Sequence, residues 1–213
     1  THPAARGRGY FTCLWEEALD VLDERGILED MELLLVTDGK SPDAKKALKA
    51  MEGEYQYSEY FLEKSLSNNL SFDKPKEAFL FLQGPLSFSP ENLSLLSSLH
   101  EQIFCNGKQE AETFIQQVLC DSSSSTYVLY KKSIPMGLFH LTIQKEECYL
   151  SGFGLHPDHQ EQGYGTILLH MAEKEASGLS HTLFLQVGDY NEAAFSLYTK
   201  QGFKWWPPLE SYH

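Results

Sequence analysis

The turn at residues 155–165 is the feature that most constrains the fold of this chain. It reads Leu155-His-Pro-Asp-His-Gln-Glu-Gln-Gly-Tyr-Gly165, and a run with helical spacing of apolar residues follows it. Two glycines between an apolar strand pattern and a helix let backbone N–H groups come close to an anion. The helix start adds unpaired donors and a partial positive charge. The segment therefore predicts a strand–loop–helix unit that binds phosphate.

A second segment, Asn191-Glu-Ala-Ala-Phe-Ser-Leu-Tyr198-Thr-Lys-Gln-Gly202-Phe203, strengthens this prediction. Together the two segments resemble the GNAT acyltransferase superfamily, whose members transfer an acetyl group from acetyl-CoA to an amine. The first family signature, Gln/Arg-x-x-Gly-x-Gly/Ala, is met by Gln160, Gly163 and Gly165. The resemblance covers roughly residue 78 to the C-terminus. The second signature is met by Asn191, Ala194, Leu197, Tyr198, Gly202 and Phe203.

The resemblance implies a site for acetyl-CoA as co-substrate. Backbone N–H groups from Gln162 to Thr166 would hold the pyrophosphate, and Gln160 would brace the loop. The pantetheine arm would pair with the strand backbone like an added strand. Asn191 would either cap the next helix or bond the pantetheine, and the sequence leaves both open. The expected cofactor-binding residues are Phe153, Gly154, Leu155, Gln160, Gln162, Gly163, Tyr164, Gly165, Thr166 and Asn191.

The chemistry needs an uncharged amine, a donor to the tetrahedral oxyanion and a proton for the departing thiolate. The resemblance assigns the proton donor to Tyr198, for which a core tyrosine on an amphipathic helix is the structural alternative. A backbone N–H near Leu155 is the expected oxyanion donor. Glu147 is the candidate base, with Glu146 and His140 as further groups that could relay a proton through water. For each of these three, a surface or packing role is the alternative.

The overall composition excludes several classes of protein. The 213 residues suffice for one or two domains with a real core. A net charge of −13 argues against nucleic acid as a partner and is compatible with a cationic acceptor, or simply with solubility. No apolar run is long enough for a membrane span, and no metal-ligand spacing appears. The four cysteines form no Cys-x-x-Cys pair, so we expect a reduced, cytoplasmic protein in which they are small buried apolar residues.

The chain also contains an internal repeat. The segment from His2 to Phe11 aligns with residues 156–165, and residues 31–36 match the strand expected at 182–187. Further on, Ala44, Leu48 and Gly53 align with Ala193, Leu197 and Gly202. Agreement over separated blocks predicts a tandem duplication.

The first copy has the features of a degenerate unit. In this alignment Phe11 replaces Gly165, Pro42 replaces Asn191 and Lys49 replaces Tyr198. We therefore expect a structural or dimerising role for it, which leaves a homodimer open. The alternative is that sequence upstream of Thr1 completes a working first site.

The predicted organisation is a partial degenerate unit at 1–64, a linker at 65–76 and an acetyltransferase domain at 77–213. The alternating tyrosines of residues 54–64 predict strands that close the first unit. The fold class is α/β, with a mixed, largely antiparallel sheet, helices on both faces, and parallel strands ending at Leu155 and Val187. Strands are expected at 78–83, 126–131, 136–144, 147–155, 182–187 and 203–206, and helices at 90–104, 108–120 and 191–201, besides the helix after the glycine turn.

These inferences favour an N-acetyltransferase that moves acetyl from acetyl-CoA to a primary amine of a small molecule or protein by direct attack. The alternative is a non-catalytic acyl-CoA-binding module that senses or regulates. A purely structural duplication would require the phosphate loop to be coincidental. The sequence does not name the acceptor, because residues 87–125, which should build its pocket, contain no motif.

Overall fold

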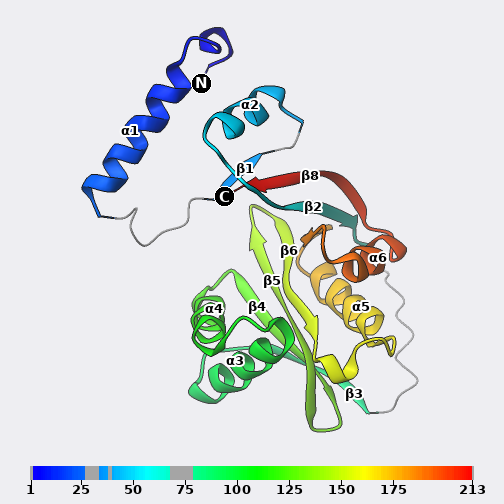
Figure 1. Cartoon of the computed structure of the whole chain (residues 1–213). Helices are drawn as coiled ribbons and strands as arrows, with labels where there is room; N and C mark the ends of the chain where they lie inside the picture. Colours follow the sequence, from blue (N-terminus) through cyan, green and yellow to red (C-terminus); the bar gives the residue numbers. More distant parts are fainter. Residues whose placement is uncertain (1, 27–33, 38–39, 68–78, 213) are drawn as a thin grey trace. The chain divides into compact units, whose positions relative to one another are not determined.

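The computed structural model describes residues 2–26, 34–37, 40–67 and 79–212 (Figure 1). The chain forms two compact units, one of residues 1–57 with 210–213 and one of residues 58–209. The larger unit holds both sequence signatures. Most of the predicted linker at 65–76 lies outside the described residues, and the predicted domain borders stay a prediction.

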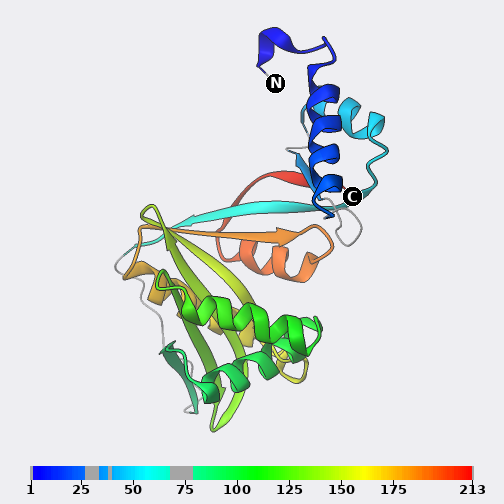
Figure 2. The ribbon, with the colours of Figure 1, turned by 90° about the vertical axis from the view of Figure 1, so that its left-hand side faces the viewer.

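The larger unit is built on a seven-stranded mixed sheet (Figures 1 and 2). All neighbouring strands with a described register are antiparallel, except for β6 and β7, which are parallel. The predicted α/β fold class is confirmed. In the order in which they lie in the sheet, the strands are β8 (Lys204–Tyr212), β2 (Tyr55–Ser65), β7 (Thr182–Gly188), β6 (Glu147–Leu155), β5 (Ile134–Gln144), β4 (Ser124–Lys131) and β3 (Leu80–Leu86).

Helices cover both faces of this sheet (Figure 2). Helices α3 (Pro90–Phe104) and α4 (Lys108–Cys120) lie on one face, and α5 (Tyr164–Ser177) and α6 (Glu192–Lys200) on the other. Ser89 caps α3, since its hydroxyl accepts a hydrogen bond from the backbone N–H of Asn92 at 3.1 Å. The bounds of α3 are those of the helix predicted at 90–104.

Two apolar cores lie on the two sides of the sheet. Val128 and Leu138 face α3 and α4, whereas Leu129, Phe139 and Leu168 belong to the larger core under α5. Neighbouring residues of β4 and β5 point to opposite faces because side chains alternate along a strand. Both strands are therefore buried on both faces of the sheet. Because β6 pairs with β5, and β7 with β6, this buried part of the sheet holds β6 and β7 in position.

The smaller unit contains the first repeat. Its elements are a 3₁₀ turn at Pro3–Ala5, α1 (Tyr10–Glu24), β1 (Leu35–Thr37) and α2 (Pro42–Ala50). Residues 31–33 of the strand predicted in this repeat lie outside the described residues. The end of β8 pairs antiparallel with β1, with Ser211 opposite Val36.

The strands that follow the two aligned segments pair crosswise. Helices α2 and α6 are offset by 150 positions in the sequence. The same offset relates two strand pairs. Phe61 of β2 lies opposite Gln186 of β7, and Ser211 of β8 lies opposite Val36 of β1. Strand β2 follows the first repeat in sequence but pairs with β7 of the second repeat. The prediction that residues 54–64 close the first unit is therefore wrong for residues 59–64, which pair with β7. Alternation identifies a strand, but it carries no information on which neighbour the strand pairs with.

The cysteines differ from their prediction. Cys148 is buried, but Cys13, Cys105 and Cys120 are exposed, and all four are free thiols. The three exposed cysteines lie on helices or at a helix end, on faces that the cores do not cover. Within the described residues, no helix is both long and apolar enough to cross a membrane. No group of three or more acidic, histidine or cysteine side chains there could hold a metal ion.

Candidate active site

The parallel pairing of β6 and β7 ends early at the centre of the sheet. Their parallel pairing is confined to Cys148 with Leu183 and Tyr149 with Phe184, although β6 runs on to Leu155. Past Tyr149, the edge of β6 that faces β7 is therefore outside the ladder. Ligands of α/β folds bind where neighbouring parallel strands separate beyond their carboxyl ends. An extended amide chain could pair with this edge as an additional strand.

A β-bulge marks the same stretch of β6. The register between β5 and β6 shifts between Leu138, opposite Gly154, and His140, opposite Ser151. Gly152 takes a left-handed φ of 53°, which favours glycine. At Gly154 the close neighbours are the side chains of Ile103 and Phe104 from α3. Gly152 thus forms the bulge, and the missing side chain at Gly154 leaves room for α3.

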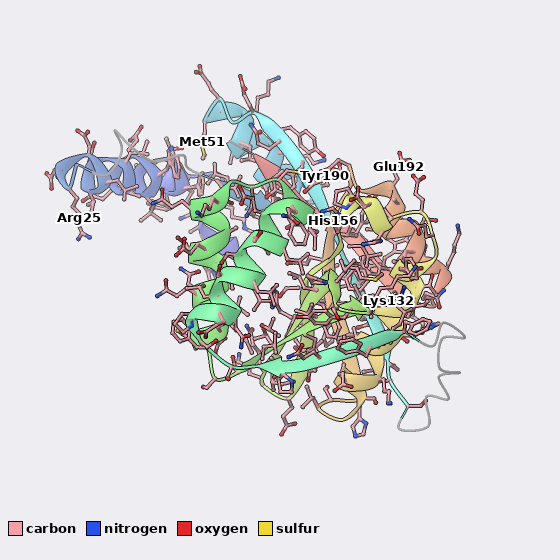
Figure 3. The ribbon with its side chains drawn as sticks, turned by 90° about the horizontal axis from the view of Figure 1, so that it is seen from below. Arg25, Met51, Lys132, His156, Tyr190 and Glu192 are labelled. Carbon is pink, nitrogen blue, oxygen red and sulfur yellow. The ribbon has the colours of Figure 1, made fainter. Side chains whose placement is uncertain are left out.

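The loop after β6 places the start of α5 beside the end of the strand. His156, labelled in Figure 3, donates its backbone N–H to the carbonyl oxygen of Met136 at 2.7 Å. The chain then makes a short 3₁₀ turn and takes left-handed φ values at Glu161 (57°) and Gly163 (84°) before α5 begins at Tyr164. The predicted strand–loop–helix unit is thus present in the structure.

The start of α5 suits an anion. No side chain caps this helix, in contrast to α3 and α6, which are capped by Ser89 and Asn191. A side chain at Gly163 would meet no atom within 4 Å, and one at Gly165 would meet only Leu197 at 3.5 Å and Leu155 at 3.9 Å. The glycines therefore leave open space beside a helix start that no side chain caps. A pyrophosphate fits such a helix N-terminus.

Two glutamines stabilise the loop from within. The side-chain amide of Gln160 donates to the carbonyl oxygen of Leu155, and that of Gln162 to the carbonyl oxygen of Asp158, both at 2.9 Å. Gln160 thereby ties the loop to the end of β6. Because both amides bond within the loop, a phosphate bound here would rely on the backbone N–H groups and the helix dipole.

Tyr164 contributes to the site through its backbone. Its side chain is buried, its hydroxyl is hydrogen-bonded to the amino group of Lys131, and that amino group lies 4.8 Å from the ring centroid. The ring therefore anchors the first turn of α5 to β4. Neither the GNAT signatures nor residue spacing had pointed to Lys131.

Tyr198 lies where α6 meets β6. Its ring centroid is 5.8 Å from that of Phe153 and 5.7 Å from that of Phe203. Only 5% of the residue is exposed, and burial raises the pKa of its hydroxyl well above the ordinary value. The structure thus brings Tyr198 together with Phe153 of the predicted pantetheine strand. Asn191 accepts a hydrogen bond from the N–H of Ala194 at 3.1 Å, so it caps α6.

Glu147 lies apart from these residues. It begins β6, seven positions before Gly154, which corresponds to about 20 Å along an extended strand. Its carboxylate accepts a hydrogen bond from the Tyr149 hydroxyl at 2.6 Å. Glu146 and Glu147 line a separate cavity of about 690 Å³, with the end of α5 and the start of β7. Their position gives no support to a role of either glutamate as the base.

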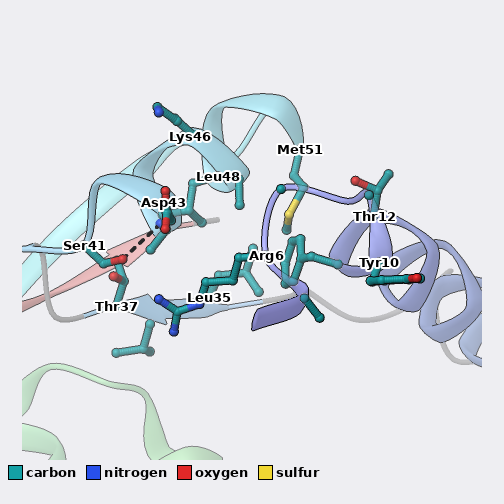
Figure 4. A pocket seen from close by; sticks show the side chains of 17 residues that line it. Arg6, Tyr10, Thr12, Leu35, Thr37, Ser41, Asp43, Lys46, Leu48 and Met51 are labelled. Carbon is teal, nitrogen blue, oxygen red and sulfur yellow. Dashed lines mark hydrogen bonds between the residues drawn. The ribbon is translucent and has the colours of Figure 1, made fainter. Parts of the chain in front are cut away.

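The first repeat reproduces the loop geometry around a cavity of about 770 Å³ (Figure 4). Gly7 and Gly9 have φ values of 74° and 78°, close to those of Glu161 and Gly163. The side chain of Ser41 caps α2 by accepting from the N–H of Ala44, as Asn191 does in α6. The cavity is lined by this loop, β1 and α2.

The structure corrects the alignment of the repeats by one position around α2. The caps place Ser41, not Pro42, at the position of Asn191. The same shift places Leu48, not Lys49, at the position of Tyr198. The backbone N–H of Gly53 bonds to Leu48 as that of Phe203 bonds to Tyr198. The alignment made from the sequence matched Ala44 and Gly53 with Ala193 and Gly202 without a gap, and it was therefore offset by one residue in this region.

Comparisons with known proteins agree with this geometry. The family model described as the acetyltransferase (GNAT) family matches residues 93–203, more than half of the chain. No curated protein sequence matches the chain.

Solved structures show the same fold at low sequence identity. A GCN5-related N-acetyltransferase from Sphaerobacter thermophilus superposes with a TM-score of 0.70 and 14% identity, over 100% of this chain and 70% of its own. A tandem GNAT protein from the clavulanic acid biosynthesis pathway gives 0.71 and 11%, over 100% and 71%. An acetyltransferase from Thermus thermophilus gives 0.51 and 21%, over 64% of this chain and 96% of its own.

Proposed function

Because this chain belongs to the acetyltransferase (GNAT) family, we propose that it transfers acetyl from acetyl-CoA to a primary amine of a small molecule or protein. The observation that carries this is the uncapped start of α5 beside the unpaired edge of β6. The first fits a pyrophosphate and the second fits the amide chain of pantetheine. Bound acetyl-CoA would supply an activated thioester at the crevice.

In this proposal the residues of the crevice divide the work. The N–H groups from Gln162 to Thr166 hold the pyrophosphate, and the backbone of Phe153, Gly154 and Leu155 holds the pantetheine. The amine nitrogen forms its bond to the acetyl carbon, the carbon–sulfur bond breaks, and the amine loses a proton. Tyr198 gives a proton to the departing sulfur, and its raised pKa keeps the phenol protonated at neutral pH.

The first repeat takes a supporting role in this proposal. It has Leu48 where the second repeat has Tyr198, and Phe11 where the second repeat has Gly165. A repeat without the tyrosine cannot protonate the thiolate in this way. The register shared by the two crosswise strand pairs, and the full coverage by a tandem GNAT protein, support a tandem duplication. We infer that the first copy serves the fold rather than a second reaction.

Calorimetric titration of acetyl-CoA into the chain tests the proposal. We expect a dissociation constant between about 1 μM and 1 mM. Gly165→Glu should abolish binding, because it puts a carboxylate where the pyrophosphate would lie. An acidic residue in the first turn suits a helix, so folding should be retained. Gly165→Gln is the matched control for bulk and should weaken binding less.

A non-catalytic acyl-CoA sensor is the alternative, and a second experiment separates it from an enzyme. If acetyl-CoA binds, a panel of primary amines is offered and released thiol is measured. Thiol release that depends on the amine and is lost in Gly165→Glu supports the transferase. Tight binding without thiol release across small amines and amino-terminal peptides would favour the sensor.

A further inference from the structure

Buried polar atoms gather under α3 and α4. Among the described residues, four buried side-chain atoms have no hydrogen-bond partner: Ser97 Oγ, His100 Nδ1, Asn106 Oδ1 and His140 Nε2. A buried polar group without a partner costs folding free energy, so each one needs an explanation. Three belong to α3 or the turn after it, and the fourth is on β5 beneath them. Figure 3 shows α3 and α4 over this part of the sheet.

His140 is the member that lies beside the bulge of β6. It is fully buried, and its Nδ1 lies 2.9 Å from the hydroxyl oxygen of Thr126. A side chain added at Gly152 would lie 2.7 Å from His140 Nε2, so the unpartnered nitrogen faces the bulge of β6. The next residue is Phe153, which contacts Tyr198. The imidazole therefore lies against the bulge of β6, on the face of the sheet that α3 and α4 cover.

His140 is held in place on every side. Thr126 fixes one nitrogen, the bulge leaves room only because Gly152 has no side chain, and Phe114 of α4 lies edge-on at 5.7 Å between ring centroids. Phe114 also lies 4.9 Å from the ring of His100. A rigid, buried imidazole with one free nitrogen has the form of a preorganised hydrogen-bonding group.

The surroundings keep this imidazole neutral. Burial, with a smaller contribution from His100, lowers the pKa of His140 to about 3. Burial also lowers the pKa of His100, against the opposing effects of Asn106 and Glu110. A neutral imidazole of such low basicity is a poor proton acceptor at neutral pH but a competent N–H donor. This argues against the proton relay considered for His140 from the sequence.

We propose that the Nε2–H of His140 donates a hydrogen bond to the carbonyl oxygen of the bound acetyl thioester. The proposal rests on the proposed function. Thr126 would donate its hydroxyl proton to Nδ1 and so hold the proton on Nε2. As the amine attacks, negative charge develops on the carbonyl oxygen, the carbon–sulfur electron pair passes to sulfur, and His140 keeps its proton throughout. It would act together with the backbone donor near Leu155.

Nitrogen NMR of the full chain labelled at histidine tests this directly. Nε2 of His140 should carry the proton, and its resonance should shift with acetyl-CoA but not with CoA, which has no carbonyl on sulfur. His140→Gln identifies the signal, and His170, bonded to Gln201, is the internal control. Equal shifts with the two ligands, or a proton on Nδ1, would overturn the proposal. Absence of any acetyl-CoA binding by calorimetry would overturn the proposed function as well.

Kinetics give an independent readout once an amine is acetylated. Loss of one oxyanion donor lowers kcat about 100-fold or more, so His140→Leu should show that loss with little change in KM for acetyl-CoA. His140→Gln keeps an N–H donor and should recover much of the rate. If His140→Leu fails to fold, a full loss of rate in folded His140→Gln would count against the donor role. An unchanged rate in folded His140→Leu would do so too.

Discussion

The amino group of Lys64 donates to the carboxylate of Glu173 at 2.5 Å, joining β2 to α5. Glu173 is 1% exposed, so the carboxylate of this ion pair is buried, whereas the Lys64 side chain is partly exposed. Lys64 follows the first repeat in sequence, whereas Glu173 belongs to the helix that starts the proposed cofactor loop. Strand β2 follows the first repeat in the sequence, but its ion pair and its pairing with β7 stabilise the second repeat.

Lys64→Met should destabilise the larger unit by about 3 kcal/mol or more, because removal of one partner leaves a buried carboxylate unpaired. Chemical unfolding followed by circular dichroism measures the change. Lys200→Met, near the end of α6, is the matched control and should lie within about 0.5 kcal/mol of the parent. Equal stability of the two variants would mean that the pair contributes nothing.

Tyr198→Phe should lower turnover about 100-fold while the affinity for acetyl-CoA stays nearly unchanged, because only the acidic hydroxyl is removed. The ring contacts with Phe153 and Phe203 are retained, so folding should survive. The measurement is amine-dependent thiol release beside a calorimetric titration. An unaltered rate would remove the acid assignment from Tyr198.

Gly152→Ala should destabilise the chain by about 2 kcal/mol or more. The added carbon would collide with the imidazole of His140 at a left-handed φ. Gly178→Ala is the control, since its φ of −78° suits any residue and its nearest neighbour would be 3.5 Å away. Thermal unfolding of both variants measures the difference, and similar melting temperatures would contradict the close packing at the bulge.

Acid should weaken the fold through His140. Its pKa is about 3 in the folded chain and about 6.5 when unfolded, so below pH 6.5 the unfolded chain binds a proton that the folded chain does not. Stability is therefore fully present above pH 6.5 and falls as the pH drops toward 3, by roughly 5 kcal/mol in total.

Urea unfolding between pH 7.5 and 4 measures this slope, and His140→Gln should flatten it relative to the parent. The lowered pKa of His100 contributes in the same direction, so some slope should remain in the variant. A parent and variant with the same pH dependence would show that His140 is already protonated or accessible in the folded chain.

Local patterns predicted much of the larger unit. The bounds of α3 and α4 follow from Ser89, Pro90 and the apolar spacing, and the parallel pair β6–β7 follows from the helix between them. The loop and helix at 155–165 were predicted because glycine conformations and helix ends are local properties. The family signatures lie in these local elements.

The partners of distant residues were not predictable in this way. Glu147 was the candidate base because it lies on the predicted central strand. In the structure it lies at the start of β6, at the end of that strand remote from Gly154. His100 and Lys131 gave no signal, because their relevance depends on what packs against them. The exposure of three cysteines likewise depends on which helix faces the cores cover.

By itself, the sequence determined most helices and strands of the larger unit and the loop that suits a pyrophosphate, since backbone conformation and side-chain period act over a few neighbouring residues. Only the tertiary structure decided that β2 pairs with β7, that Tyr198 meets Phe153, and that His140 turns a free nitrogen to the bulge. These relationships join residues far apart in the chain. They are set by which buried surfaces fit together, which no local pattern contains.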